Sequence, residues 1–282
     1  MGQITKCTAE PGARAHYTDC EPGLRFQPLT LGDIGTLAPF FSSNPRRICD
    51  STIGCTFMWR DFHSTEYAVC GGVLYFKAEY APGVVAFSQP RGDISDAASV
   101  VAQIMDYCRA ENIQPRLCAV SGRFLEEVRR LYPSAHMLAD PAWSDYLYDA
   151  EDIKALAGRR YSGQRNHINK FTRAYPEWRF EPVNDANLAR VRAFFADYAK
   201  EHVKDYPAYD EGNRKALEVI DNLARYGQFG GVLLVGDGDG EIAGAAFGET
   251  VGDTLFVHTE KALTRFEGAY PVLVREFARA FA

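Results

Sequence analysis

The last third of the chain carries the pattern that most constrains the fold. Three strand-like segments, GGVLLVG, IAGAAFGET and TLFVHTEKA, are separated by the short stretches GDGDGE and VGD. Tight turns rich in glycine and aspartate between such segments predict an antiparallel meander. Helical patterns flank the meander, with ANLARVRAFFADYAKEHV and NRKALEVIDNLARYG before it and YPVLVREFARAFA after it. This part of the chain is therefore predicted to be a sheet covered by helices.

The first half also alternates strands with helices. Apolar residues recur at helical spacing in DISDAASVVAQIMDYCRAEN, and SGRFLEEVRRLYP reads as a second helix that ends at Pro133. RLCAV is a short buried-type strand, and Thr30 or Asp33 is placed to cap a first helix. The predicted fold class is α+β, with mixed, mostly antiparallel sheets flanked by helices.

A chain of 282 residues suits two domains. We expect a flexible leader at residues 1–23, where Pro and Gly occur without an apolar period, an N-terminal domain at 24–140 and a C-terminal domain at 141–282. YLYD, at the start of the second domain, is predicted to be a strand. No apolar run reaches the roughly 18 residues of a membrane span, and no signal peptide is readable, so we expect a cytoplasmic protein.

The seven cysteines form no C-x-x-C pair and have no histidine at metal-binding spacing. We therefore expect reduced thiols and no metal site. The formal net charge of −6 argues against general coating of nucleic acid, so any contact with a polyanion should be local.

One basic segment stands out in this acidic chain. Seven cations and a single acid, Glu177, lie between residues 154 and 179. A helix over residues 163–175 would place Ile168, Phe171 and Tyr175 on a packed face. The opposite arc would present the donor and phosphate-binding candidates Arg165, Asn166, Asn169, Lys170 and Arg173. Such donors suit a phosphate-bearing polyanion, although the arc also fits a solvated helix face that pairs with acids elsewhere.

The strand TLFVHTEKA holds candidate acid–base groups. Strict alternation would put Phe256, His258 and Glu260 on one face of the strand. His258 or Glu260 could then accept a proton from an incoming amine, and Glu249 at the end of the previous strand is a third candidate. The alternative is a satisfied polar pair under a loop.

The loop after this strand is a candidate anion-receiving corner. Arg265 and Gly268 lie in it, and Tyr270 and Pro271 begin the following helix. Free N–H groups in a first helical turn attract an anion such as a phosphate or an oxyanion. Gly268 could equally serve only to permit the turn.

The succession YLYDAEDIKALAGRRYSGQRNHINKF, followed later by HTEKALTRFEGAYPVLVREF, resembles the bacterial phosphatidylglycerol lysyltransferase C-terminal domain family. The family pattern has a DY-x-Y strand, an L-x-x-L-x-G-[KR]-[KR] helix, a [KR]-R-N-x-I-N-x-F segment and a late H-x-E-K-A strand with R-G-A-Y. Gln164 stands where a basic residue is usual, and Glu267 where an arginine is common. The resemblance covers about residues 24–282, more loosely in the first half.

The resemblance implies two tandem GNAT-like (acyl-CoA N-acyltransferase) domains, as in Fem-type aminoacyltransferases. Some members move an amino acid from charged tRNA to a lipid head group, and many are soluble proteins. The expected function is transfer of an aminoacyl group from aminoacyl-tRNA to an amine or hydroxyl acceptor, either a small molecule or a lipid head group. No cofactor beyond this donor is expected. Family members usually continue past the final helix, so we expect the second domain to lack its closing strands at Ala282.

Two other functions stay open. An acyl-CoA-dependent N-acetyltransferase would use a [QR]-x-x-G-x-[GA] loop, but the matching loop here ends in Tyr270 and contains Glu267. A negative charge about 5 Å from a phosphate opposes its binding by roughly 1–3 kcal/mol, so aminoacyl-tRNA is the favoured donor. A non-catalytic ligand-binding or interaction module is the third hypothesis.

Under the favoured hypothesis, aminoacyl transfer from tRNA, Arg265 polarises the oxyanion, Glu260 or His258 takes the proton and Tyr270 returns it to the leaving hydroxyl.

Overall fold

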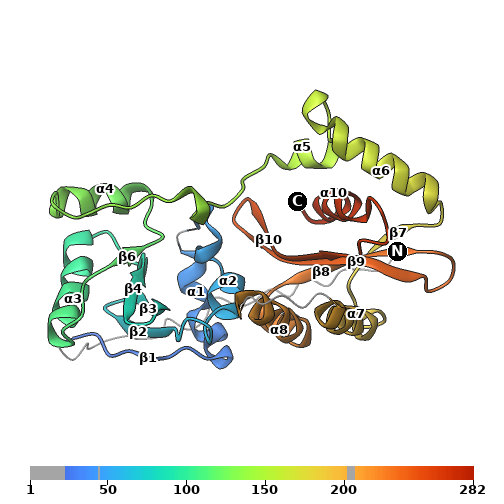
Figure 1. Ribbon diagram of the computed structural model, residues 1–282. Helices are drawn as coiled ribbons and strands as arrows, with labels where there is room; N and C mark the ends of the chain where they lie inside the picture. The colour runs from blue at the N-terminus through green and yellow to red at the C-terminus, as the bar shows by residue number, and fades with distance from the viewer. Residues whose placement is uncertain (1–22, 44, 202–206) are drawn as a thin grey trace.

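The computed structural model describes residues 23–43, 45–201 and 207–282. The predicted leader, apart from Gly23, lies outside these residues. The described chain forms two sheets that lie side by side, each covered by helices (Figure 1). The α+β class predicted from the sequence is confirmed. No helix among the described residues is long and apolar enough to cross a membrane.

The first sheet has the order β1-β2-β3-β4-β6, with β5 paired to β3. Its strands are β1 (Gln27–Pro28), β2 (Glu66–Cys70), β3 (Val73–Ala81), β4 (Val84–Ser88), β5 (Arg91–Gly92) and β6 (Leu117–Cys118). The β4–β6 pair is parallel and the others are antiparallel.

Alternation along β3 divides the core of the first half between the two faces of the sheet. Val73 and Tyr75 pack with α3 (Ala97–Ala110) and α4 (Gly122–Leu131). Leu74 and Phe76 pack on the other face with α1 (Ile34–Ser42) and α2 (Ile53–Met58). Thr30 and Asp33 form a capping box at the turn before α1, as their positions predict.

The second sheet is the predicted meander with one additional strand. Its order is β10-β9-β8-β7, and every pair is antiparallel. The strands are β7 (Arg179–Pro182), β8 (Phe229–Val235), β9 (Glu241–Val251) and β10 (Thr254–Ala262). The helix α10 (Ala269–Phe281) covers one face, and α7 (Leu188–Glu201) and α8 (Pro207–Asp221) cover the other (Figure 1).

The short helix α9 (Leu223–Tyr226) and α8 join the two halves of the molecule. Val219 and Tyr226 are buried in the same cluster as Leu37 and Phe57 of the first half. Burial of apolar surface therefore holds the two sheets together. An ionic network lies beside this cluster, in which Arg60 binds Glu218 through two hydrogen bonds of 2.7 and 2.9 Å.

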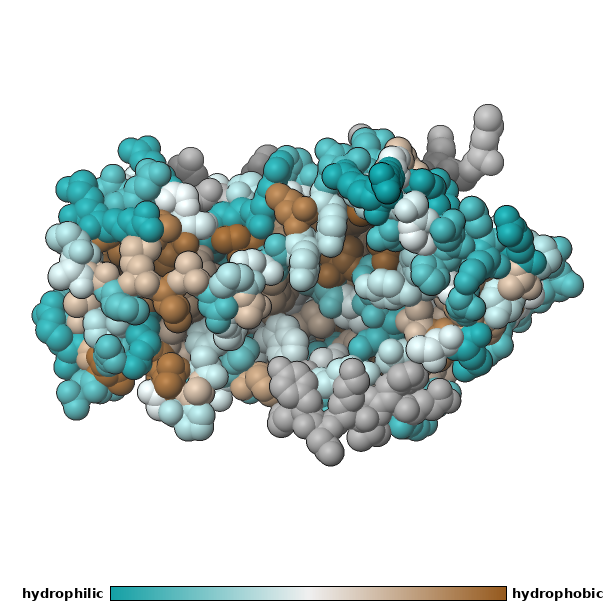
Figure 2. Space-filling model, turned by 45° about the horizontal axis from the view of Figure 1, so that its top comes forward, coloured by the Kyte–Doolittle hydropathy of each residue, from teal (hydrophilic) through white to brown (hydrophobic). Residues whose placement is uncertain are grey.

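Two local features differ from the sequence predictions. YLYD is not a strand, because residues 144–149, which we call the connecting segment, run extended and pair with no described strand. Its side chains stay outside, with Tyr146 88% and Leu147 63% exposed. Figure 2 views the face on which this connection runs, and polar and apolar side chains are interspersed there. Cys70 is disulfide-bonded, so the expectation of reduced thiols is wrong for this residue.

Candidate functional site

A β-bulge in β10 decides where the predicted acid–base residues point. Phe256 pairs with Glu249 and Glu260 pairs with Ala246, with an extra residue inserted between Val257 and Thr259. Directly paired residues share a face of an antiparallel sheet, and an inserted residue reverses the alternation beyond it. The prediction that His258 and Glu260 face one site is therefore wrong.

His258 and Glu249 form a buried pair at the boundary between the two halves. Their Nε2 and Oε1 atoms are 2.8 Å apart, and each side chain is only 6% exposed. The same Glu249 oxygen accepts a 2.6 Å hydrogen bond from the backbone N–H of Gly54, at the start of α2. The pair thus ties β9 and β10 to a helix of the first half, and little of it is open to a substrate.

Gly54 and Gln228 complete this cluster, which we call the boundary cluster (Gly54, Gln228, Glu249 and His258). A Cβ atom on Gly54 would lie 2.4 Å from His258 Nε2 and 2.6 Å from Gln228 Nε2. Gln228 Oε1 is buried without a hydrogen-bond partner among the described residues. The sequence predicts neither residue, since a glycine beside a cysteine and a glutamine before a strand carry no special pattern.

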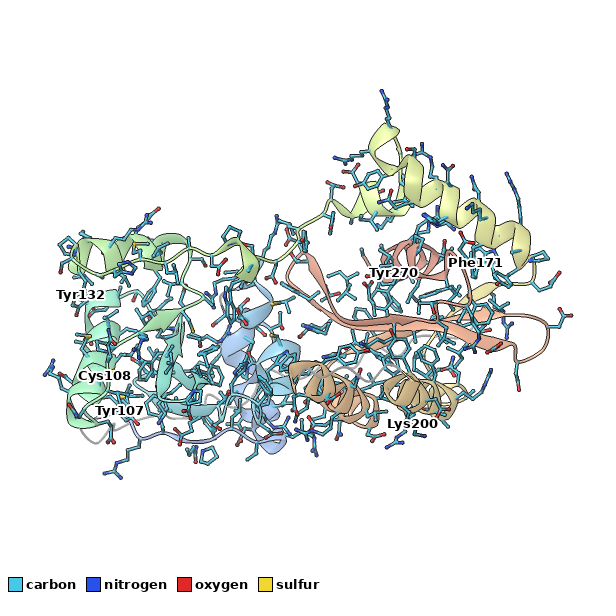
Figure 3. The ribbon with its side chains drawn as sticks, in the orientation of Figure 1. Tyr107, Cys108, Tyr132, Phe171, Lys200 and Tyr270 are labelled. Carbon is cyan, nitrogen blue, oxygen red and sulfur yellow. The ribbon has the colours of Figure 1, made fainter. Side chains whose placement is uncertain are left out.

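Glu260 and Tyr270 form a second pair on the opposite face of the sheet. The Tyr270 hydroxyl donates a 2.8 Å hydrogen bond to Glu260 Oε2, which links β10 to the first turn of α10. Tyr270 is 52% exposed and Glu260 is partly exposed, so this pair can meet a substrate. Figure 3 labels Tyr270 on α10, next to α6 (Ser162–Ala174).

The surroundings shift the acidity of both members of this pair. Burial raises the pKa of Glu260, and the hydrogen bond from Tyr270 opposes part of that rise. Burial and the negative charge of Glu260 also raise the pKa of Tyr270, and Tyr148 of the connecting segment adds to the shift. A carboxylate with a raised pKa is a stronger base near neutral pH than an ordinary glutamate.

Gly268 brings α6 against the start of α10. Its φ is 89°, a conformation that favours glycine, and a Cβ atom there would lie 2.4 Å from the carbonyl oxygen of His167. The backbone of α6 thus covers one side of the predicted anion corner. Gly268 is required for this close packing, whatever else the loop does.

The basic helix has the packed face that the sequence predicts. Ile168 and Phe171 are buried, and Tyr175 packs against the same cluster. Most cations of the segment, however, have partners nearby. Lys154 pairs with Glu151, Arg160 with Asp152, Lys170 with Glu267 and Arg179 with Glu181.

Arg165 binds backbone rather than facing outward. Its Nη1 donates to the carbonyl oxygens of Leu156 and Gly158, after α5 (Ala150–Ala155). Arg173, Asn166 and Asn169 are exposed, and no ion pair or side-chain hydrogen bond joins them to the part of the chain that the structure describes. Arg159, just before α6, is likewise exposed and without an ion pair among those residues. The surface that remains for an anion is thus smaller than the sequence suggests.

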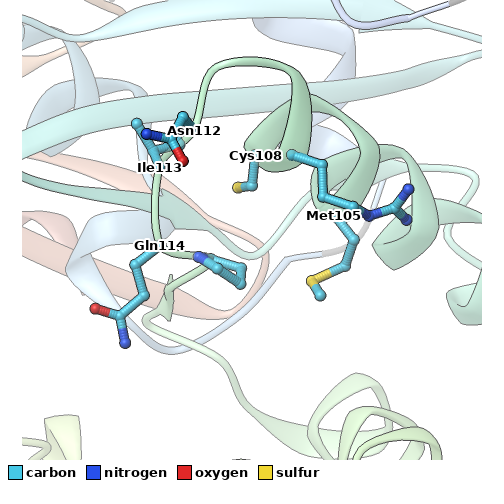
Figure 4. A pocket seen from close by; sticks show the side chains of 7 residues that line it. Met105, Cys108, Asn112, Ile113 and Gln114 are labelled. Atoms are coloured by element: carbon cyan, nitrogen blue, oxygen red, sulfur yellow. The ribbon is translucent and has the colours of Figure 1, made fainter.

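The guanidinium of Arg265 already has an acidic partner. It pairs with Glu241, at the start of β9. Both residues line a pocket with Arg190, Phe194 and Asp197 of α7. A different pocket, at the end of α3, is lined by Met105, Cys108, Asn112, Ile113 and Gln114 (Figure 4). It contains none of the predicted site residues.

The fold and these clusters define an α+β protein of two joined sheets, with a carboxylate–tyrosine pair where the last helix follows the meander. Residues 41–282 match the family model described as "Phosphatidylglycerol lysyltransferase, C-terminal". The chain therefore belongs to this family, and the resemblance predicted from the sequence is confirmed. The family is named for a transferase, so membership indicates that the chain is a transferase.

Two solved structures are similar to this chain. The first is a conserved protein of unknown function from Bacteroides thetaiotaomicron VPI-5482, with 26% identity over 92% of this chain and 87% of that chain and a TM-score of 0.81. The second is L-PGS from Bacillus licheniformis, with 10% identity over 79% of this chain and 66% of that chain and a TM-score of 0.48. A comparison with curated proteins found no match.

Proposed function

We propose that the chain is an acyltransferase that moves an aminoacyl group from aminoacyl-tRNA to an amine or hydroxyl acceptor. The 2.8 Å hydrogen bond between Tyr270 and Glu260 is the observation that carries the proposal. Of the two acid–base pairs, this one combines a half-exposed position with a raised carboxyl pKa. Family membership supplies the class of reaction.

The proposed reaction is attack of the acceptor nitrogen or oxygen on the ester carbonyl of the donor. Glu260 takes the proton that the acceptor loses as the new bond to the carbonyl carbon forms. The bond from that carbon to the ribose oxygen of the tRNA then breaks. Tyr270 gives its hydroxyl proton to the leaving ribose oxygen and regains one from Glu260, so protons balance over one turnover.

The exposed polar groups of α6 support a polyanionic donor. Arg173, Asn166 and Asn169 recur at spacings of three and four residues, so they share one face of the helix. They offer a cation and two amides to a phosphate backbone, and they lie on the same helix whose backbone contacts Gly268. The proposed acceptor is a small molecule or a lipid head group. We also propose that each half has a GNAT-like fold and that the transfer needs no further cofactor.

Acyl-CoA is the second candidate donor because of one contact. Lys170 lies 3.3 Å from Glu267 and neutralises the acid that would otherwise repel a diphosphate in the loop before α10. Both side chains are more than 60% exposed, so this compensation is weak. Aminoacyl-tRNA stays the favoured donor.

A single-turnover assay distinguishes the donors. Purified chain is mixed with a primary amine and either a pool of tRNA charged with labelled amino acids or labelled acetyl-CoA. The proposal expects labelled amide from the charged tRNA, and a matched control variant, Glu267→Gln, should retain the activity. Transfer from acetyl-CoA alone would replace the proposed donor, and no transfer from either would leave the binding module as the better account.

A further inference from the structure

Two cysteines and an aspartate meet beside the boundary cluster. Cys49 and Asp50 lie in the 3₁₀ turn Cys49–Ser51, and Cys55 lies in the first turn of α2. One ligand atom from each of the three residues lies within 4.8 Å of the other two. The sequence hides this meeting because the spacing C-x₅-C is longer than the usual C-x₂₋₄-C of zinc sites. The capping turn at Thr52 reverses the chain and brings the two thiols together.

We propose that Cys49, Asp50 and Cys55 bind a zinc ion, and that the carboxylate of Asp145, held beside them by the backbone N–H of Cys49, turns to complete the ligand set when the ion binds. The Cys55 sulfur is 3.7 Å from Asp50 Oδ1. Zinc–sulfur and zinc–oxygen bonds of about 2.3 and 2.1 Å at a tetrahedral angle place a sulfur and an oxygen ligand about 3.6 Å apart. This pair therefore already has the separation that a zinc ion requires.

Asp145 comes to the cluster from a distant part of the chain. One of its carboxylate oxygens accepts a 2.8 Å hydrogen bond from the backbone N–H of Cys49. That bond holds the connecting segment against the turn, so a rotation of the exposed Asp145 side chain suffices to bring a carboxylate oxygen to the metal. Two thiols and two carboxylates form a donor set that suits zinc, which accepts both sulfur and oxygen ligands.

Nearby cations match the charge of such a site. Two thiolates and two carboxylates carry four negative charges, and zinc leaves two of them uncompensated. Arg91 donates a 2.8 Å hydrogen bond to the Asp50 carbonyl oxygen, and Arg46 interacts electrostatically with the Asp50 carboxylate. These two guanidinium groups supply the remaining positive charge. Cys49 and Cys55 are only partly buried, so an ion can reach them.

The position gives the metal a consequence for the fold. Cys55 follows Gly54, whose N–H binds Glu249 of the second half. A zinc ion held by Cys55 and Asp145 would therefore fix the start of α2 and the connecting segment together. Because structural zinc binding contributes directly to folding, the metal-bound chain should melt at a higher temperature than the metal-free chain.

Metal content and cobalt substitution test the proposal on the full chain. The protein is purified in reductant without chelator, and zinc is measured per chain. Cobalt is then added to metal-free protein, and the intense thiolate-to-cobalt absorption is recorded. We expect about one zinc per chain and a cobalt spectrum typical of tetrahedral thiolate ligation. Cys55→Ser and Cys49→Ser should weaken binding by more than about tenfold, since even partners outside the ligand set are worth 10–100-fold.

Two further variants keep the test decisive if a cysteine variant folds poorly. Asp145→Asn changes an exposed side chain and should lower zinc affinity while leaving the circular dichroism spectrum unchanged. Cys118→Ser removes another free thiol and should bind metal like the wild type. The proposal is overturned if the reduced wild type binds neither metal, if Cys49→Ser and Cys55→Ser leave the cobalt spectrum unchanged, or if the two thiols form a disulfide and take up no metal after reduction.

Discussion

His258 and Glu260 are two residues apart on β10, yet they serve opposite faces of the same sheet. His258 binds Glu249 at the boundary with the first half, and Glu260 binds Tyr270 on α10. The bulge between Val257 and Thr259 causes this division. One strand thus contributes both to the contact between the halves and to the proposed catalytic pair.

The first prediction concerns the boundary cluster. Gly54→Ala places a methyl group within 2.6 Å of three polar side-chain atoms and should lower the free energy of unfolding by about 1–3 kcal/mol. Chemical denaturation measures the change. Gly35→Ala is the matched control, since its Cβ meets no atom within 4 Å and alanine is the better helix former. Equal effects of the two substitutions would contradict the packing described here.

The second prediction concerns pH and the ionic network between the halves. Burial raises the pKa of Glu218, but hydrogen bonds from Arg60, Tyr226 and Lys215 outweigh it and lower the pKa to about 2. A depressed carboxyl pKa stabilises the fold above the unfolded value of 4.5, and this contribution is lost as the pH falls towards 2. Wild-type stability should therefore decline over that range.

Glu218→Gln should flatten this decline and lower the free energy of unfolding by about 3 kcal/mol at pH 7. The reason is that the ammonium group of Lys215, a side chain only 1% exposed, loses one of its carboxylate partners. Asp106→Asn, at an exposed helix pair, should change stability by less than about 0.5 kcal/mol. Denaturation at several pH values makes the comparison. An unchanged acid slope in the Glu218 variant would show that the network does not set acid stability.

The meander and the helices follow from local periodicity, which depends on neighbours along the chain and is therefore readable from one sequence. The bulge at His258 depends on pairing with β9, and strict alternation cannot anticipate it. The charge imbalance of residues 154–179 is likewise offset by acids just outside that window, Asp152 and Glu181, and by Glu267 far along the chain.

The third prediction tests contact with a polyanion. The double variant Arg173→Ala/Arg159→Ala lacks two exposed cations. A plot of the logarithm of the tRNA-binding constant against the logarithm of the salt concentration should therefore become less steep, by about 0.7–0.9 per cation removed. Filter binding over a range of salt concentrations measures the slope. Arg192→Ala removes a cation that pairs with Asp221 on the opposite side of the sheet and should leave the slope unchanged. If Arg192→Ala lowers the slope as much per cation as the double variant does, this face of α6 does not contact the tRNA.

The fourth prediction concerns the pH dependence of catalysis. A general base works when deprotonated, so activity should rise with pH through the raised pKa of Glu260. Tyr270→Phe removes a hydrogen bond that favours the charged carboxylate, so the pKa should rise further and the acidic limb should move to higher pH. The pH profile of kcat/KM measures the shift. A limb that stays in place or moves to lower pH would exclude this role for Tyr270.

The single-turnover rate of aminoacyl transfer in Glu260→Gln, compared with the wild type, shows whether Glu260 takes the proton from the acceptor. Glutamine keeps the size of the side chain and can accept the Tyr270 hydrogen bond, but it cannot take a proton. We expect Glu260→Gln to fold, to bind the donor normally and to transfer the aminoacyl group about 10²–10⁴-fold more slowly. A wild-type transfer rate in Glu260→Gln would exclude Glu260 as the general base.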